Sequence, residues 1–209
     1  MFLQFLTLIF KNRVGASYGD FVVAGNGINQ RIGAISFMLI MALAMGYQPF
    51  AGFNYGAKNY QRLRSGLRIT AIYTTALSLF FSIVFAVFGH NLITLFIRDS
   101  GTIDAGTKLL RATVWALPFT GVQMTLMVTF QALGKPVLAA IVTLGRDFLF
   151  YLPFLFILDY FWHFDGFMYC QPLADALTTV AAIILGIRLF KETRTLWSNK
   201  DGYEQRSEA

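Results

Sequence analysis

Residues 69–97, ITAIYTTALSLFFSIVFAVFGHNLITLFI, decide the fold, because they contain no Asp, Glu, Lys or Arg. A helix needs about 20 mainly apolar residues to cross the roughly 30 Å hydrocarbon core of a bilayer, and this stretch exceeds that length. Backbone N–H and C=O groups in lipid must pair within their own segment. The stretch is therefore predicted to be a membrane-spanning helix.

Four further apolar runs flank this stretch. They are residues 32–57, residues 112–134, residues 136–158 (interrupted by Arg146 and Asp147) and residues 166–187 (interrupted by Asp175). The composition agrees, since 13% of the residues are charged, about half the roughly 25% of a soluble domain. This composition excludes an ordinary soluble enzyme and a disordered chain. A single cysteine, Cys170, also excludes a disulfide scaffold.

The runs and the polar turns between them predict an all-α, polytopic membrane protein with six transmembrane helices. The expected helices cover residues 1–17, 20–47, 66–97, 106–133, 137–161 and 167–190. Together they form one membrane lobe over residues 1–192, followed by a polar cytoplasmic tail over residues 193–209.

The basic residues predict the orientation, because Lys and Arg favour cytoplasmic loops. The side with the 58–68 loop, Lys135 and the tail carries more of them than the opposite side. Both termini are therefore expected in the cytoplasm. The net charge of +6 is spread between apolar runs, so no nucleic-acid partner is expected.

The most unusual stretch is residues 46–62, GYQPFAGFNYGAKNYQR. Three glycines and Pro49 predict a helix that unwinds at the inner membrane face. Lys58 and Arg62 would then meet anionic lipid headgroups. Two interpretations stay open here, a structural loop that sets the orientation and a gate.

This stretch resembles the loop after the eighth helix of multidrug and toxic compound extrusion (MATE) transporters. The resemblance rests on Gly46, Gln48, Pro49, Gly52, Asn54, Gly56, Ala57, Lys58 and Arg62. Weaker similarities follow in order at residues 19–24, 117–118, 130–136, 146–153 and 171–175. The resemblance covers about residues 1–192, and the best match is to bacterial drug exporters.

The resemblance implies a secondary efflux transporter in the bacterial inner membrane that exchanges small organic cations for sodium or protons. It implies no bound cofactor. Such transporters have twelve helices in two lobes, and this chain is similar to the second lobe. The expected partners are the lipid bilayer and a first lobe or a second copy of the chain.

Two alternatives to an exporter stay open. One is a truncated or split-gene membrane fragment without transport of its own, and the other is a flippase for lipid-linked oligosaccharides from the same superfamily. No metal-ligand or nucleophile motif is present, so the sequence indicates neither a metal site nor an enzyme.

Polar residues inside the spans are the candidate site, because polar groups in lipid are costly and face a cavity or a partner helix. Asn26 and Gln30 share one face of the second span, next to Arg31. They are expected either to line a central cavity or to hold helices together by hydrogen bonds. Gln123 is a neutral candidate on the fourth span.

Asp147 and Asp175 are the carboxylates deep within spans. Each is expected either to take up a coupling proton or to be a structural acid in an ion pair. Arg146 and Asp147 are adjacent on a helix, so their side chains are expected to diverge by about 100° and not to pair directly.

Overall fold

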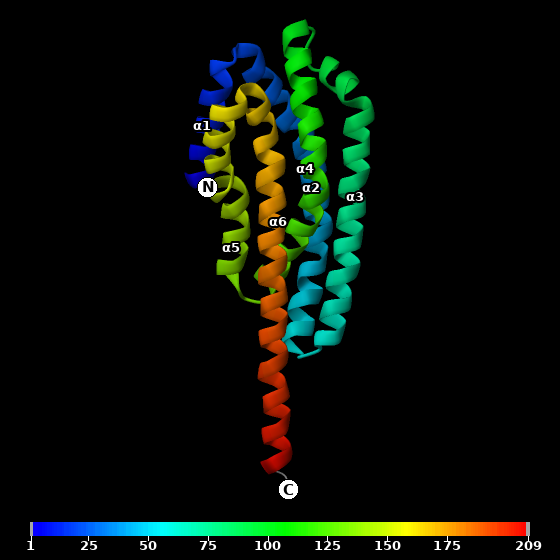
Figure 1. Cartoon of the computed structure of the whole chain (residues 1–209). Helices are drawn as coiled ribbons and strands as arrows, with labels where there is room; N and C mark the ends of the chain where they lie inside the picture. The colour runs from blue at the N-terminus through cyan, green and yellow to red at the C-terminus, as the bar shows by residue number, and fades with distance from the viewer. Residues whose placement is uncertain (1, 208–209) are drawn as a thin grey trace.

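The computed structural model describes residues 2–207 as an all-α bundle, and no strand occurs among these residues (Figure 1). The predicted all-α class is confirmed. The elements are α1 (Phe2–Ser17), α2 (Asp20–Gly56), α3 (Tyr60–Thr94), α4 (Ser100–Ala132), α5 (Pro136–Leu144), the π-helix η1 (Gly145–Leu149) and α6 (Tyr151–Ser207).

The segment Pro136–Lys191 is interrupted twice. The π-helix η1 lies between α5 and α6, and His163 has non-helical backbone angles (φ 47°, ψ −127°) inside α6. Figure 1 shows the chain rising through α5 and the first part of α6, reversing near the top, and descending through the rest of α6. This reversal separates two arms, as expected for the predicted helices 137–161 and 167–190.

Four segments are long and apolar enough to cross a membrane. They are Asp20–Gly56, Tyr60–Thr94, Ser100–Ala132 and Pro136–Lys191. The chain is thus polytopic, as predicted, while the count of six transmembrane helices stays a prediction. The backbone of the predicted tail is helical as far as Ser207, and the side chains from residue 192 onward lie outside the described residues.

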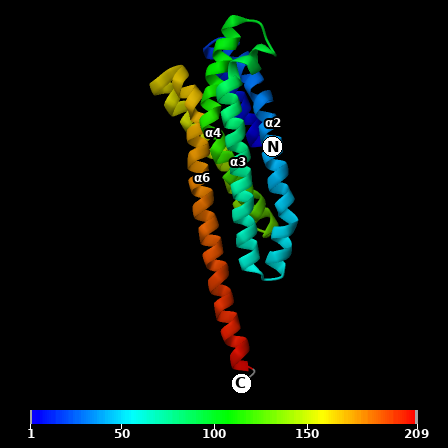
Figure 2. The same ribbon diagram turned by 90° about the vertical axis from the view of Figure 1, so that its right-hand side faces the viewer.

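Helix α4 is the centre of the bundle. It contacts α2, α3, α5 and α6, and Figure 2 shows it between α6 and α3. The most apolar part of α4 is 67% buried, against 28% for α2 and 22% for α3. The outer helices therefore leave much of their apolar surface on the outside of the bundle, where lipid is the favourable solvent.

Glycines allow α4 to approach its neighbours closely. A Cβ on Gly25 of α2 would lie 2.8 Å from the Gly106 backbone, and a Cβ on Gly121 would lie 2.7 Å from the Thr74 backbone of α3. Small residues at helix interfaces are typical of membrane bundles, in which van der Waals packing drives association. The bundle interior is therefore held by backbone-to-backbone packing on two sides of α4.

The prediction that the chain unwinds after residue 47 is wrong. Helix α2 continues through Pro49 to Gly56. Proline is tolerated in membrane helices because neighbouring groups satisfy the freed backbone. Two side-chain hydrogen bonds hold the last turns of α2: the Tyr47 hydroxyl donates to the Leu63 carbonyl of α3 (3.0 Å), and the Asn54 amide donates to the Phe50 carbonyl (2.8 Å).

The predicted starts of two further helices are also too late. Helix α3 begins at Tyr60 rather than residue 66, because the Asn59 side chain accepts from the Arg62 N–H (3.2 Å). Helix α4 begins at Ser100 rather than residue 106, because the Asp99 carboxylate accepts from the Thr102 N–H (2.9 Å). Both are N-caps, which satisfy unpaired N–H groups of the first turn.

Candidate functional site

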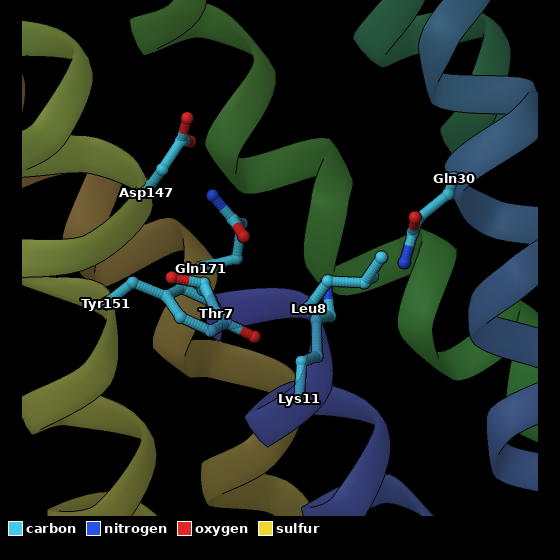
Figure 3. A pocket seen from close by; sticks show the side chains of 7 residues that line it. All are labelled: Thr7, Leu8, Lys11, Gln30, Asp147, Tyr151 and Gln171. Atoms are coloured by element: carbon cyan, nitrogen blue, oxygen red, sulfur yellow. The ribbon is translucent and has the colours of Figure 1, made fainter. Parts of the chain in front are cut away.

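An open pocket of about 180 Å³ lies where four helical elements meet (Figure 3). Helix α1 supplies an aliphatic, a hydroxyl and an ammonium side chain, and α2 and α6 supply one amide each. The lining residues are Thr7, Leu8, Lys11, Gln30, Asp147, Tyr151 and Gln171. Two charged and several polar side chains thus converge inside apolar helices.

Lys11 is a site residue that the sequence interpretation missed. Its Nζ lies 5.6 Å from the centroid of the Tyr151 ring, within reach of a cation–π contact. As a basic residue after the first apolar stretch, Lys11 belongs to the opposite side in the orientation argument and not to the polar residues predicted for the site. Thr7 and Lys11 are four residues apart, so they share one face of α1, and this spacing was the available signal.

Asp175 is a buried structural acid paired with Arg146. The Arg146 Nε lies 2.9 Å from the Asp175 Oδ1, and the Asp175 side chain is 1% exposed. Neither atom has an aligned hydrogen-bond partner, so the contact is an ion pair without good hydrogen-bond geometry. Arg146 also lies over the Phe37 ring of α2, with 5.5 Å between its guanidinium carbon and the ring centroid.

The π-helix η1 places Arg146 and Asp147 together. The Phe150 N–H donates to the Gly145 carbonyl (3.0 Å), which is the i→i+5 pattern that widens the turn. The Arg146 Nε and the Asp147 Oδ1 lie 4.0 Å apart. The expectation that these neighbours do not pair is therefore wrong, although their 4.0 Å separation is the longest that counts as an ion pair. The two residues lie in a π-turn rather than an α-turn.

Gln123 ties α4 to the same turn of α6. Its Nε2 donates to the Asp175 carbonyl (2.6 Å) and to the Thr179 hydroxyl (2.9 Å). Gln123 is fully buried and its Oε1 has no hydrogen-bond partner. Gln171, one turn before Asp175, donates weakly to the Asp175 Oδ2 (3.4 Å). Side chains from α4, η1 and α6 therefore meet around Asp175.

The predicted polar face of α2 divides between packing and the pocket. Asn26 is buried, and the neighbouring Asn29 donates to the Thr113 hydroxyl of α4 (3.0 Å). Gln30 is exposed and lines the pocket, and Arg31 is exposed as well. The structure thus brings Gln30 together with Asp147, while Asn26 lies within the bundle.

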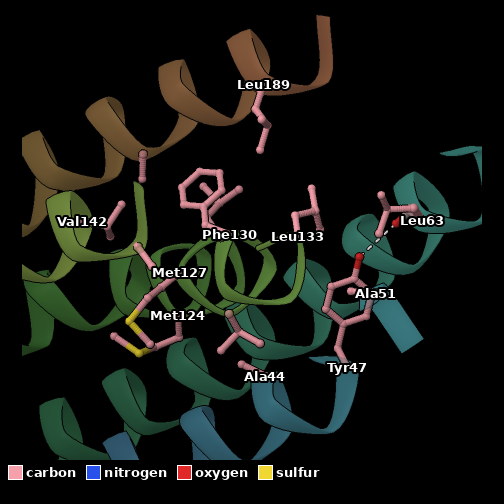
Figure 4. Close-up of a cluster of buried hydrophobic side chains, with 14 of the residues drawn as sticks. Ala44, Tyr47, Ala51, Leu63, Met124, Met127, Phe130, Leu133, Val142 and Leu189 are labelled. Carbon is pink, nitrogen blue, oxygen red and sulfur yellow. Dashed lines mark hydrogen bonds between the residues drawn. The ribbon is translucent and has the colours of Figure 1, made fainter. Parts of the chain in front are cut away.

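The residues that carry the 46–62 pattern form a helix end and a tight turn. Asn54 is buried, Gln48 and Gly52 are half-buried, and Gly46, Pro49, Gly56, Ala57, Lys58 and Arg62 are exposed. Lys58 takes the left-handed conformation (φ 61°) in the turn. Figure 4 shows Tyr47 reaching from α2 to Leu63 at the start of α3, beside the core around Phe130. A gating role for this segment stays a prediction.

Two titratable groups lie in turns outside the spans. The Tyr18 hydroxyl donates to the Asp159 carboxylate, and burial together with this contact raises the pKa of Tyr18 to about 12. The Thr102 hydroxyl and N–H donate to the Asp99 carboxylate and lower the pKa of Asp99 below its usual 3.8. Tyr18 thereby fastens the turn between α1 and α2 to the first arm of α6.

Comparisons with known proteins agree on one family. The MatE family model matches residues 1–157. Two relatives are multidrug export proteins MepA. The Staphylococcus aureus protein is 27% identical over 172 residues, covering 81% of this chain and 37% of MepA. The Staphylococcus saprophyticus protein is 22% identical over 183 residues, covering 88% of this chain and 40% of MepA.

Solved structures share the fold. The Vibrio cholerae MATE transporter VcmN in its bent form has a TM-score of 0.85 at 23% identity, covering 91% of this chain and 43% of VcmN. A MATE structure in the straight conformation has a TM-score of 0.87 at 18% identity, covering 93% and 44%. The chain therefore spans less than half the length of these similar proteins.

Proposed function

The chain belongs to the MatE family, and from this premise we propose that it forms one lobe of a secondary exporter for small organic cations. The pocket of charged and polar side chains within apolar helices carries the proposal. Such groups are costly in lipid and are found where they face a cavity or a partner. Exchange for sodium or protons supplies the driving force.

We further propose that transport needs a complementary lobe in addition to the lobe that this chain forms. Two observations and the general mechanism of such transporters support this proposal. The chain covers 37% of MepA, the pocket is open, and family transport by alternating access requires two repeats that rock around a shared site.

The proposed location is the bacterial inner membrane, with both termini in the cytoplasm. Figure 1 supports the sidedness of the C-terminal end, because the turn between α2 and α3 and the end of α6 lie towards the same end of the bundle. The turns after α1 and α3 lie at the other end. The basic residues around the turn at Lys58 favour the cytoplasmic side.

Flux of a fluorescent cation tests the exporter proposal. Inverted membrane vesicles would hold this chain alone, or this chain together with the part of MepA that it does not match. Ethidium uptake would be driven by an imposed sodium or proton gradient. If uptake occurs only when the MepA part is present, the chain is one lobe of a transporter. If uptake also occurs with this chain alone, two copies of the chain form the transporter.

A substitution in the pocket tests the site, and the same substitution outside the pocket is the matched control. Asp147→Asn is expected to lower gradient-driven uptake at least about tenfold, the loss that follows from removing one charged contact. Asp104→Asn, at an exposed position of α4, is expected to leave uptake unchanged. If neither vesicle type takes up ethidium, the chain is a non-transporting fragment and the proposal is wrong.

A further inference from the structure

The two cations near the pocket differ in how close they lie to carboxylates. Arg146 lies 2.9 Å from the Asp175 carboxylate and 4.0 Å from the Asp147 carboxylate. Within the described residues, no carboxylate oxygen lies within 4.0 Å of the Lys11 Nζ. The acids therefore gather around Arg146, and Lys11 contributes a positive charge to a different wall of the pocket.

Lys11 is partly enclosed by the helices around the pocket. It is half-buried on α1, about two turns before the chain leaves this helix at Ser17, which places it roughly 10 Å from that end at 1.5 Å per residue. An ammonium group at such depth is costly unless it meets a partner. The Tyr151 ring supplies a weak one at 5.6 Å.

Three further polar groups that line the pocket can donate hydrogen bonds, beside the Asp147 carboxylate, which accepts them. Gln30 and Gln171 each carry an amide N–H₂ that can donate. The Tyr151 hydroxyl is buried beside the Cys170 thiol and makes no standard hydrogen bond within the described residues, although its residue lines the pocket. One ammonium, two amides and one hydroxyl are donors of the kind that an oxyanion accepts, whereas Asp147 is the group of this pocket that suits a cation.

We propose that Lys11, with Gln30, Gln171 and Tyr151, forms a subsite for an oxyanion. The anion is the carboxylate of a zwitterionic drug or the phosphate of a lipid headgroup. A pocket of about 180 Å³ accommodates such a group, and Asp147 on another wall of the pocket stays available to the cationic part of the molecule. This inference rests on the proposed function and names the substrate class of the same pocket.

A matched pair of dyes isolates the carboxylate. Rhodamine 110 carries a free carboxylate, and rhodamine 123 is its methyl ester. Fluorescence anisotropy of both dyes would be measured with the purified full chain in detergent. Wild type is expected to bind rhodamine 110 more tightly. Lys11→Gln is expected to weaken that binding at least about tenfold and to leave rhodamine 123 unchanged, because one charge-assisted hydrogen bond is lost.

Control variants separate charge from folding. Lys11→Arg is expected to retain the preference for rhodamine 110, and Lys108→Gln, at an exposed position of α4, is expected to behave as wild type. Equal binding of both dyes by wild type, or an equal loss of both in Lys11→Gln, would overturn the carboxylate source. Circular dichroism shows whether each variant keeps its helical content.

Lipid quantification distinguishes the second source of the oxyanion. Phospholipid that copurifies with wild type and with Lys11→Gln would be measured by mass spectrometry. A Lys11-dependent loss of bound phospholipid, without a dye preference, assigns the subsite to a headgroup phosphate. If neither ligand depends on Lys11, the subsite does not exist. These readouts need only binding, so they are separate from a failure of ethidium transport.

Discussion

Replacing Arg146 by methionine is expected to destabilise the bundle strongly. Methionine keeps the length of the side chain and removes its charge, which leaves Asp175 without a cation at 2.9 Å. The Asp175 side chain is 1% exposed, so water cannot replace the lost partner. Breaking a buried pair by removing one member costs about 3–5 kcal/mol in the free energy of unfolding.

The reciprocal change is expected to cost less. Asp175→Asn leaves a guanidinium that is 20% exposed and still lies 4.0 Å from Asp147, so we expect a loss of about 1–2 kcal/mol. The double variant removes both charges and is expected to be close to Asp175→Asn in stability. The two substitutions should therefore be coupled by about 3–5 kcal/mol, because the cost of Arg146→Met disappears once Asp175 is neutral; this is at or above the upper end for residues in direct contact.

Unfolding by SDS, followed by tryptophan fluorescence, measures these free energies for the four proteins of the cycle. Arg111→Met, at an exposed position of α4, is the control for loss of an arginine. Additivity of the two single variants within about 0.5 kcal/mol would refute the pairing argument. So would a cost below about 1 kcal/mol for Arg146→Met.

Three local features of the helices give further predictions. Gly121→Ala places a Cβ 2.7 Å from α3 backbone atoms and should cost about 1–3 kcal/mol in SDS unfolding, whereas Gly46→Ala, with open space around its Cβ, should cost little. Asn59→Ala removes the cap of α3 and should cost about 1 kcal/mol, with Asn59→Asp retaining most of it. The lowered pKa of Asp99 means that its cap stabilises α4 above the unfolded pKa near 3.8. That contribution is lost as the pH falls through the folded value. Amide exchange at Thr102 should therefore speed up relative to an unfolded peptide below about pH 4, and Asp99→Asn should abolish this pH step.

The sequence predicts the membrane helices well but their ends poorly. Apolar length is a local property, so the run at residues 69–97 was sufficient to predict α3. The end of α2 depends on tertiary contacts, because the Tyr47–Leu63 hydrogen bond joins two helices across the turn. The caps at Asn59 and Asp99 were readable signals that the apolar-run criterion did not use.

The candidate site was predicted in part. Asp175 lies in an ion pair with Arg146, as one of the two alternatives expected, and its uptake of a coupling proton stays a prediction; Asp147 and Gln30 line one pocket. The π-turn at η1 was not predicted, because the length and spacing of apolar residues do not report an i→i+5 hydrogen bond such as that from the Phe150 N–H to the Gly145 carbonyl. Lys11 was missed because a basic residue at the end of an apolar run was interpreted as a topology signal.

The unequal burial of the helices has a consequence for biogenesis. The most apolar window of α3 has a mean hydropathy of 2.1 and is 22% buried, whereas that of α4 has 1.2 and is 67% buried. A nascent α3 can leave the translocon for lipid on its own hydropathy. Helix α4 follows it in synthesis and gains most from partition onto helices already in place. Insertion of α4 should therefore depend on α2 and α3. A substitution that prevents α2 or α3 from inserting would first alter the membrane topology of α4 and the segments after it.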